Sequence, residues 1–78
     1  MDPSLEALHK TAGLKAGEER TCGKKVRYSA EDSANRAAVE MNAKPTTRKA
    51  LEAYPCPFCA LWHVGRKMSL EELTAASS

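Results

Sequence analysis

The chain has 78 residues, of which 42% are hydrophobic but only 5% aromatic, so it forms one small domain whose core is too thin to be stable on apolar burial alone. Its formal net charge of +2 conceals an uneven distribution, because residues 20–67 carry ten basic against four acidic side chains while both flanking segments are net acidic. No stretch has the roughly 20 consecutive apolar residues of a membrane helix, and the first twenty residues lack the apolar run of a secretory signal, so we expect a cytoplasmic protein without membrane contacts.

Residues 1–21 are predicted to form a flexible N-terminal segment. Asp2 can cap a short helix with Pro3 in its first turn. Leu5 and Ala12 share one face of this helix, and Gly13 is a plausible stop. Because an isolated helix of this length is marginal in water, we expect the segment to be frayed or loosely attached.

Residues 22–67 are predicted to form the folded domain, and they begin with a short strand. Val26 and Tyr28 alternate with Lys25 and Arg27, which is the period of a half-buried strand. The alternation predicts that the two apolar side chains point inward and the two cations point outward.

A helix is predicted next, from the capping residue Ser29 to about Ala43, with Pro45 excluding further helix. Small and apolar residues recur on one face at intervals of three and four, which predicts close packing against a partner. This face consists of Ala30, Ala34, Ala37, Ala38 and Met41.

A β-hairpin is predicted to follow, with strands near 50–54 and 61–65 and with the segment from Cys56 to Cys59 as its turn. Residues 68–78 then form a short C-terminal helix and tail. This helix opens with Ser69 and Glu72 in the spacing of a capping box. The predicted fold class is therefore α+β: a small zinc-stabilised domain with a short strand, a central helix, a zinc-knuckle β-hairpin and a short C-terminal helix.

Three cysteines and one histidine provide a set of metal ligands. Cys56 and Cys59 form a Cys-x-x-Cys loop, His63 follows it closely, and Cys22 lies 33 intervening residues upstream. Three thiolates and one imidazole make the closed tetrahedral shell that structural zinc prefers. Because such a shell leaves no position for a reactive water, we expect a zinc cofactor without enzymatic activity.

Other interpretations of these residues stay open at this point. The three thiols can be separate side chains that share no metal ion, with His63 on the surface, and His9 is a rival imidazole ligand. The Cys-Pro-Phe-Cys motif also resembles the redox site of glutaredoxins, although only 19 residues follow Cys59, which is too few for the rest of that fold. Thiol redox chemistry is therefore a less favoured function.

Several short motifs make the chain similar to a group of small zinc-finger-like proteins of actinobacteria and their bacteriophages. The matching residues are Cys22-Gly23-Lys24, Tyr28, the alanine-rich helix, the run from Tyr54 to Cys59, and Trp62-His63-Val64-Gly65. The resemblance implies Cys22, Cys56, Cys59 and His63 as zinc ligands. In such proteins a glycine is common directly after the second cysteine of the loop, where Ala60 stands in this chain.

The function expected from the sequence is that of a regulator that binds nucleic acid or the transcription machinery. Basic side chains around the expected metal site can contact the phosphates of DNA or RNA. They are Lys24, Lys25, Arg27, Arg48, Lys49, Arg66 and Lys67. A protein partner such as RNA polymerase is also possible. The alternative function is a protein-binding adaptor or inhibitor that docks through Leu70 and Leu73 of the C-terminal helix. No small-molecule substrate is expected.

Overall fold

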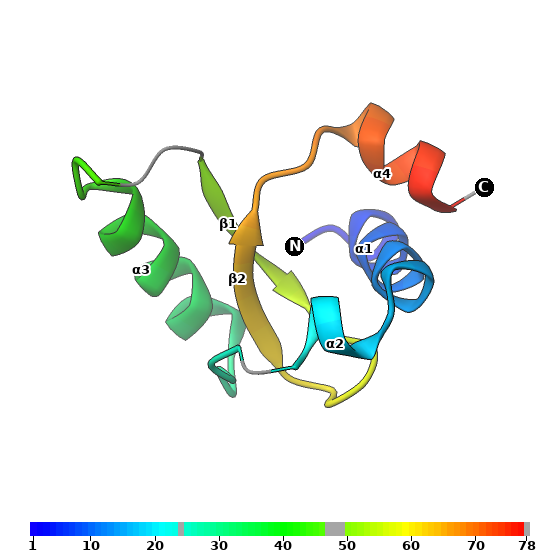
Figure 1. Cartoon of the computed structure of the whole chain (residues 1–78), viewed down its shortest axis with the longest axis horizontal. Helices are drawn as coiled ribbons and strands as arrows, with labels where there is room; N and C mark the ends of the chain where they lie inside the picture. Colours follow the sequence, from blue (N-terminus) through cyan, green and yellow to red (C-terminus); the bar gives the residue numbers. More distant parts are fainter. Residues whose placement is uncertain (24, 47–49, 78) are drawn as a thin grey trace.

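The computed structural model describes residues 1–23, 25–46 and 50–77, and it contains four helices and one hairpin within them (Figure 1). The elements in chain order are α1 (Pro3–Ala16), α2 (Glu18–Thr21), α3 (Glu31–Asn42), β1 (Leu51–Pro55), β2 (Trp62–Arg66) and α4 (Leu70–Ser77). This mixed composition, with a two-stranded antiparallel hairpin and a C-terminal helix, confirms the predicted α+β class. None of the helices in these ranges is both long and apolar enough to cross a bilayer.

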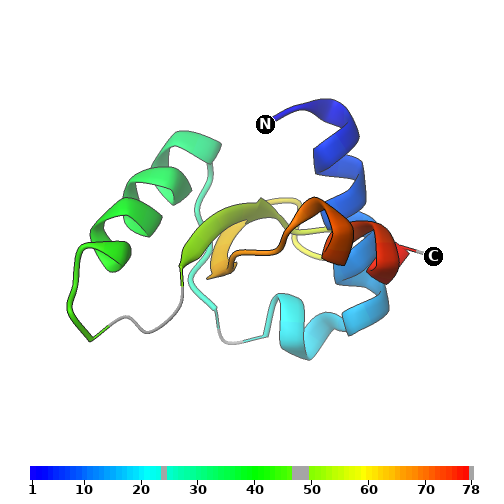
Figure 2. The ribbon, with the colours of Figure 1, turned by 90° about the horizontal axis from the view of Figure 1, so that it is seen from above.

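The hairpin is the middle layer of the molecule. β1 and β2 pair antiparallel, from Leu51 opposite Arg66 at the open end to Pro55 opposite Trp62 beside the turn. α3 packs on one side of this hairpin, while α1, α2 and α4 lie together on the other side (Figures 1 and 2). The turn that carries the Cys-x-x-Cys motif lies at the end of the hairpin that is close to α2 in Figure 1.

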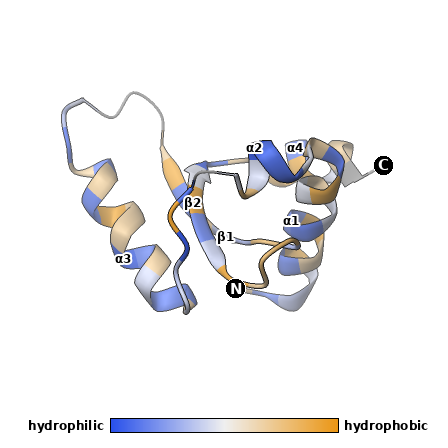
Figure 3. Cartoon of the chain, turned by 60° about the horizontal axis from the view of Figure 1, so that its bottom comes forward, coloured by the Kyte–Doolittle hydropathy of each residue, from blue (hydrophilic) through white to orange (hydrophobic). Residues whose placement is uncertain are grey.

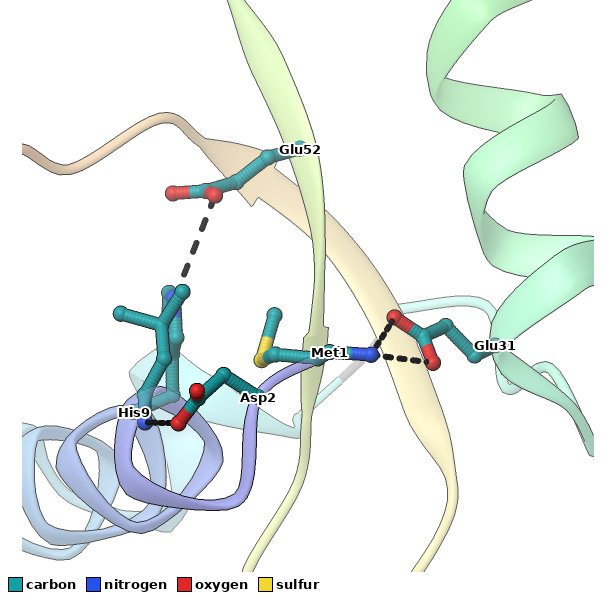
Figure 4. A network of polar contacts seen from close by, with 6 residues as sticks. Met1, Asp2, His9, Glu31 and Glu52 are labelled. Atoms are coloured by element: carbon teal, nitrogen blue, oxygen red, sulfur yellow. Dashed lines mark hydrogen bonds and ion pairs between the residues drawn. The ribbon is translucent and has the colours of Figure 1, made fainter.

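α3 approaches the hairpin closely because its inner face is made of alanines. Ala34 and Ala38 are buried, as their spacing predicted. The predicted cap was wrong, since the N-cap is Ala30 and no side chain caps the helix. In the first turn of the helix, the Glu31 carboxylate instead pairs with the N-terminal amine of Met1, which lies 2.8 Å from both carboxylate oxygens (Figure 4).

The N-terminal segment is packed rather than loose. Asp2 caps α1 by accepting a hydrogen bond of 2.7 Å from the amide of Ser4. Gly13 does not end the helix as predicted; it is buried, and Thr21 Oγ1 donates a 3.0 Å hydrogen bond to its carbonyl. α1 continues to Ala16 and packs against α4, α2 and β1. Docking on these elements supplies the stability that an isolated helix lacks.

α4 begins with the capping box that the sequence predicts. The Ser69 amide donates to Glu72 Oε1 at 3.2 Å, and the Glu72 amide donates to Ser69 Oγ at 3.1 Å. Leu73 is only 1% exposed, whereas Leu70 is 64% exposed. The predicted docking face of Leu70 and Leu73 is therefore wrong, because Leu73 already belongs to the protein's own core.

Candidate metal centre

The four predicted ligands come together at one end of the hairpin. Cys22 follows α2, Cys56 and Cys59 lie in the turn between the strands, and His63 lies on β2. One ligand atom of each residue lies within 4.8 Å of those of the other three. The structure thus forms a cluster that can hold a metal ion from residues that are 41 positions apart at most.

The spacing of the cluster fits a tetrahedral ion. Cys59 Sγ and His63 Nε2 lie 3.5 Å apart. Two ligands of a tetrahedral ion with metal–sulfur and metal–nitrogen distances of about 2.3 and 2.0 Å are separated by roughly 3.5 Å. Cys22, Cys56 and His63 are buried and Cys59 is partly buried, so the side chains point into the protein rather than into water.

The orientation of His63 is fixed by a hydrogen bond from its other ring nitrogen. Nδ1 lies 2.6 Å from the carbonyl oxygen of Val26 and acts as the donor, since a carbonyl can only accept. The lone pair of the neutral ring is then on Nε2, which faces the thiols. Metal-bound histidines usually make such a hydrogen bond with the ring nitrogen that does not bind the metal.

Backbone amides in the turn point toward the sulfurs. The amide of Phe58 donates to Cys56 Sγ at 3.4 Å. Burial tends to raise the pKa of the Cys59 thiol, but the amide of Leu61, the neighbouring thiols and the charge of Arg27 together bring this pKa below its usual value. For Cys22, burial and the hydrogen bonds of the neighbouring thiols dominate, and its pKa is raised.

Arg27 is one of the basic residues expected around the site, and it lies close enough to the thiols to interact with them. The Cys22 thiol raises the pKa of the arginine further. A metal ion with three thiolates carries one excess negative charge, and Arg27 offsets it. Two other nearby cations have partners of their own: Lys25 Nζ lies 5.4 Å from the centroid of the Tyr54 ring, and Arg66 pairs with Glu72 at 3.1 Å.

The predicted strand around Val26 is wrong. Only Tyr28 forms a β-bridge, with Trp62, and Val26 is 63% exposed. The reason is that the Val26 carbonyl accepts a hydrogen bond from His63. The backbone of this segment is therefore positioned by the candidate metal centre and not by pairing with a strand. Its side chains therefore do not alternate, and Arg27 turns toward Cys22.

The other candidate residues divide into described and undescribed positions. Lys25, Arg27, Arg66 and Lys67 are all exposed. Lys24, Arg48 and Lys49 lie outside the residues that the structure describes.

The rival interpretations of the cysteines and of His9 find no support in the geometry. The Cys-x-x-Cys motif lies in a hairpin turn and does not open a helix, which a glutaredoxin-like site requires. His9 is buried on α1 beside Glu52 and is not part of the cluster.

Comparison of the chain with protein-family models, with curated proteins and with solved structures gives no match. The assignment of the site therefore depends on its geometry and chemistry.

Proposed function

We propose that the protein is a non-catalytic zinc-binding module that binds nucleic acid as a regulator. The observation that carries the zinc assignment is the convergence of three cysteine sulfurs and one imidazole nitrogen within 4.8 Å. Soft thiolates and an imidazole in a tetrahedral arrangement favour Zn²⁺ over the hard cations, which prefer oxygen. Four protein ligands fill the shell, so the metal stabilises the fold and has no open position for a substrate.

Nucleic-acid binding is supported by the charge around this centre. Residues 20–67 carry six more basic than acidic side chains, and Lys25, Arg66 and Lys67 are exposed. Such side chains attract phosphates without reading sequence. Arg27 is a weaker candidate than the sequence indicated, because its guanidinium is already engaged with Cys22.

The test is the salt dependence of binding by the zinc-loaded chain. Fluorescence anisotropy with labelled duplex DNA, single-stranded DNA and RNA should show an affinity that falls as salt rises. The Lys67→Glu variant should weaken binding and reduce the slope of log K against log salt by about one. Lys44→Glu, which makes the same charge change at an exposed position beyond α3, is the matched control and should have a much smaller effect.

Two results would reject nucleic-acid binding. One is no binding to any of the three probes at low salt. The other is equal loss of affinity in the Lys67→Glu and Lys44→Glu variants, which would show a nonspecific effect of net charge. Zinc content, measured on the same samples, reports separately on the metal assignment.

A further inference from the structure

The protein has a pocket that is separate from the metal centre. It has a volume of about 470 Å³, and its lining residues come from α1, α2, the hairpin, α4 and the segments that connect them. Figure 3 shows α1, α2 and α4 together on one side of the hairpin. None of the four metal ligands lines it. Its volume lies within the roughly 300–1,000 Å³ that is typical of small-molecule sites.

Four cationic side chains line this pocket, and each comes from a different part of the chain. Lys15 belongs to α1, Arg20 to α2, Lys25 to the segment after Cys22, and Arg66 to β2. The lining residues include no carboxylate. Arg66 already pairs with Glu72 at 3.1 Å, and Glu52 lies 3.9 Å from His9, another lining residue. A concave surface lined by one sign of charge concentrates small ions of the opposite sign.

The inner wall of the pocket is aromatic. The rings of His9 and Tyr54 are nearly parallel, with an interplanar angle of 14° and centroids 6.5 Å apart. Gly65 makes room for this wall, because a Cβ there would lie 2.9 Å from Tyr54 Cε1 and 3.2 Å from Lys25 Nζ. The Lys25 ammonium lies over the Tyr54 ring, 5.4 Å from its centroid.

The wall also contains a polar atom without a hydrogen bond. His9 is buried, and its Nε2 has no hydrogen-bond partner among the described residues. The closest carboxylate oxygen, Glu52 Oε1, is 3.9 Å away, which is too far for a hydrogen bond (Figure 4). Burial lowers the pKa of His9 although Glu52 opposes this effect, so the ring is neutral at pH 7. The positive charge of the pocket therefore comes from its lysines and arginines.

We propose that this pocket binds a small phosphorylated ligand with a planar apolar part, the chemical class of nucleoside monophosphates. The cationic lining attracts a doubly charged phosphate, with Arg66 shared with Glu72, and the rings of Tyr54 and His9 line the same pocket, where they can contact the planar part. The ligand is either a free nucleotide or the phosphorylated end of a strand, since both present the same groups. The proposal does not depend on nucleic-acid binding along the rest of the basic surface.

Binding is tested by NMR or calorimetric titration of the zinc-loaded full chain with AMP, adenosine and inorganic phosphate. AMP should bind with a dissociation constant below about 1 mM at low salt, and each of the other two at least about tenfold more weakly. Titrations with a 5′-phosphorylated trinucleotide and with its 5′-hydroxyl form show whether the ligand is a free nucleotide or the phosphorylated end of a strand. Preference for the phosphorylated strand over AMP assigns the pocket to strand ends, and preference for AMP assigns it to free nucleotides; both results support the site.

Matched variants locate the binding. Ala16→Phe places a ring at the pocket and should weaken AMP binding by about tenfold or more, whereas Ala7→Phe, on an exposed position of the same helix outside the pocket, should change it less than about twofold. Arg20→Glu should weaken AMP binding similarly, with Lys44→Glu as its charge-matched control. The arginine variant keeps the test decisive if Ala16→Phe disturbs folding, which zinc content and melting would report.

The proposal is overturned if AMP, GMP, CMP and UMP all fail to bind at about 10 mM. It is also overturned if adenosine or phosphate alone binds as well as AMP, or if each variant and its control have the same effect.

Discussion

Removal of the metal should unfold this protein, because the metal centre forms a large part of its core. Among the described residues, the largest fully buried side chains are Leu73, His63 and Cys56, and the last two belong to the cluster that can hold a metal ion. The remaining buried apolar residues are mostly alanines, such as Ala34 and Ala53. Without the ion, three sulfurs and an imidazole would stay together with little apolar surface to hold them.

The expected magnitude follows from the length of the chain and the chemistry of the site. Domains are stable by about 0.05–0.15 kcal/mol per residue, which for this length gives roughly 4–12 kcal/mol. A structural zinc ion contributes on the order of 10 kcal/mol or more. The metal therefore supplies about as much free energy as the whole domain possesses, and the metal-free chain should be largely unfolded at 25 °C.

The assay is a circular-dichroism melt with and without a strong chelator, together with the fluorescence of Trp62 and a zinc stoichiometry. His63→Asn should lower the zinc content and remove the cooperative transition. His9→Asn makes the same substitution at the other histidine, which lies outside the cluster, and should retain one zinc per chain. A metal-free protein that still melts cooperatively within about 5 °C of the loaded protein, a shift of only ~1 kcal/mol, would refute the reasoning.

Three smaller perturbations test details of the same structure. Ala60 has a φ of 61°, so Ala60→Gly should relieve the left-handed strain and raise the free energy of unfolding by about 1 kcal/mol in denaturant titrations; a loss of stability would contradict this. Gly23 has a φ of 30°, and a Cβ there would lie 2.3 Å from the carbonyl oxygen of Glu19. Gly23→Ala should therefore displace Cys22 and weaken zinc binding, measured by competition with a chromogenic chelator. An unchanged zinc affinity would be inconsistent with the described turn. Leu73→Ala should cost about 2–4 kcal/mol of unfolding free energy and Leu70→Ala less than about 0.5 kcal/mol, and similar costs would show that α4 does not pack as described.

The cluster of three cysteines and one histidine could be predicted because the residue types and their spacing are themselves the signal. Cys56, Cys59 and His63 lie close in sequence on a hairpin, and the composition calls for an additional source of stability. The capping box of Ser69 and the alanine face of α3 could be predicted equally well, because the local spacing of residues determines both.

What could not be predicted depends on contacts between distant segments. Alternation around Val26 indicated a strand, but the carbonyl of that residue is used by His63, 37 residues later. The docking of α1 on α4 joins the two ends of the chain, and no local pattern reports it. The cationic pocket likewise combines side chains such as Lys15 and Arg66, which meet only after the chain has folded.

The uneven distribution of the ligands along the chain sets the order in which the shell closes. Three donors lie within one hairpin, so they can capture an ion while the rest of the chain is still unfolded. Cys22 must close a loop of 33 residues that contains α3, at a cost of roughly 3 kcal/mol in chain entropy, so its sulfur is the last to bind and the first to leave. Replacement of that one cysteine would therefore release α2 from the centre, while α1 keeps its contacts with α4 and β1 and the hairpin keeps its three donors.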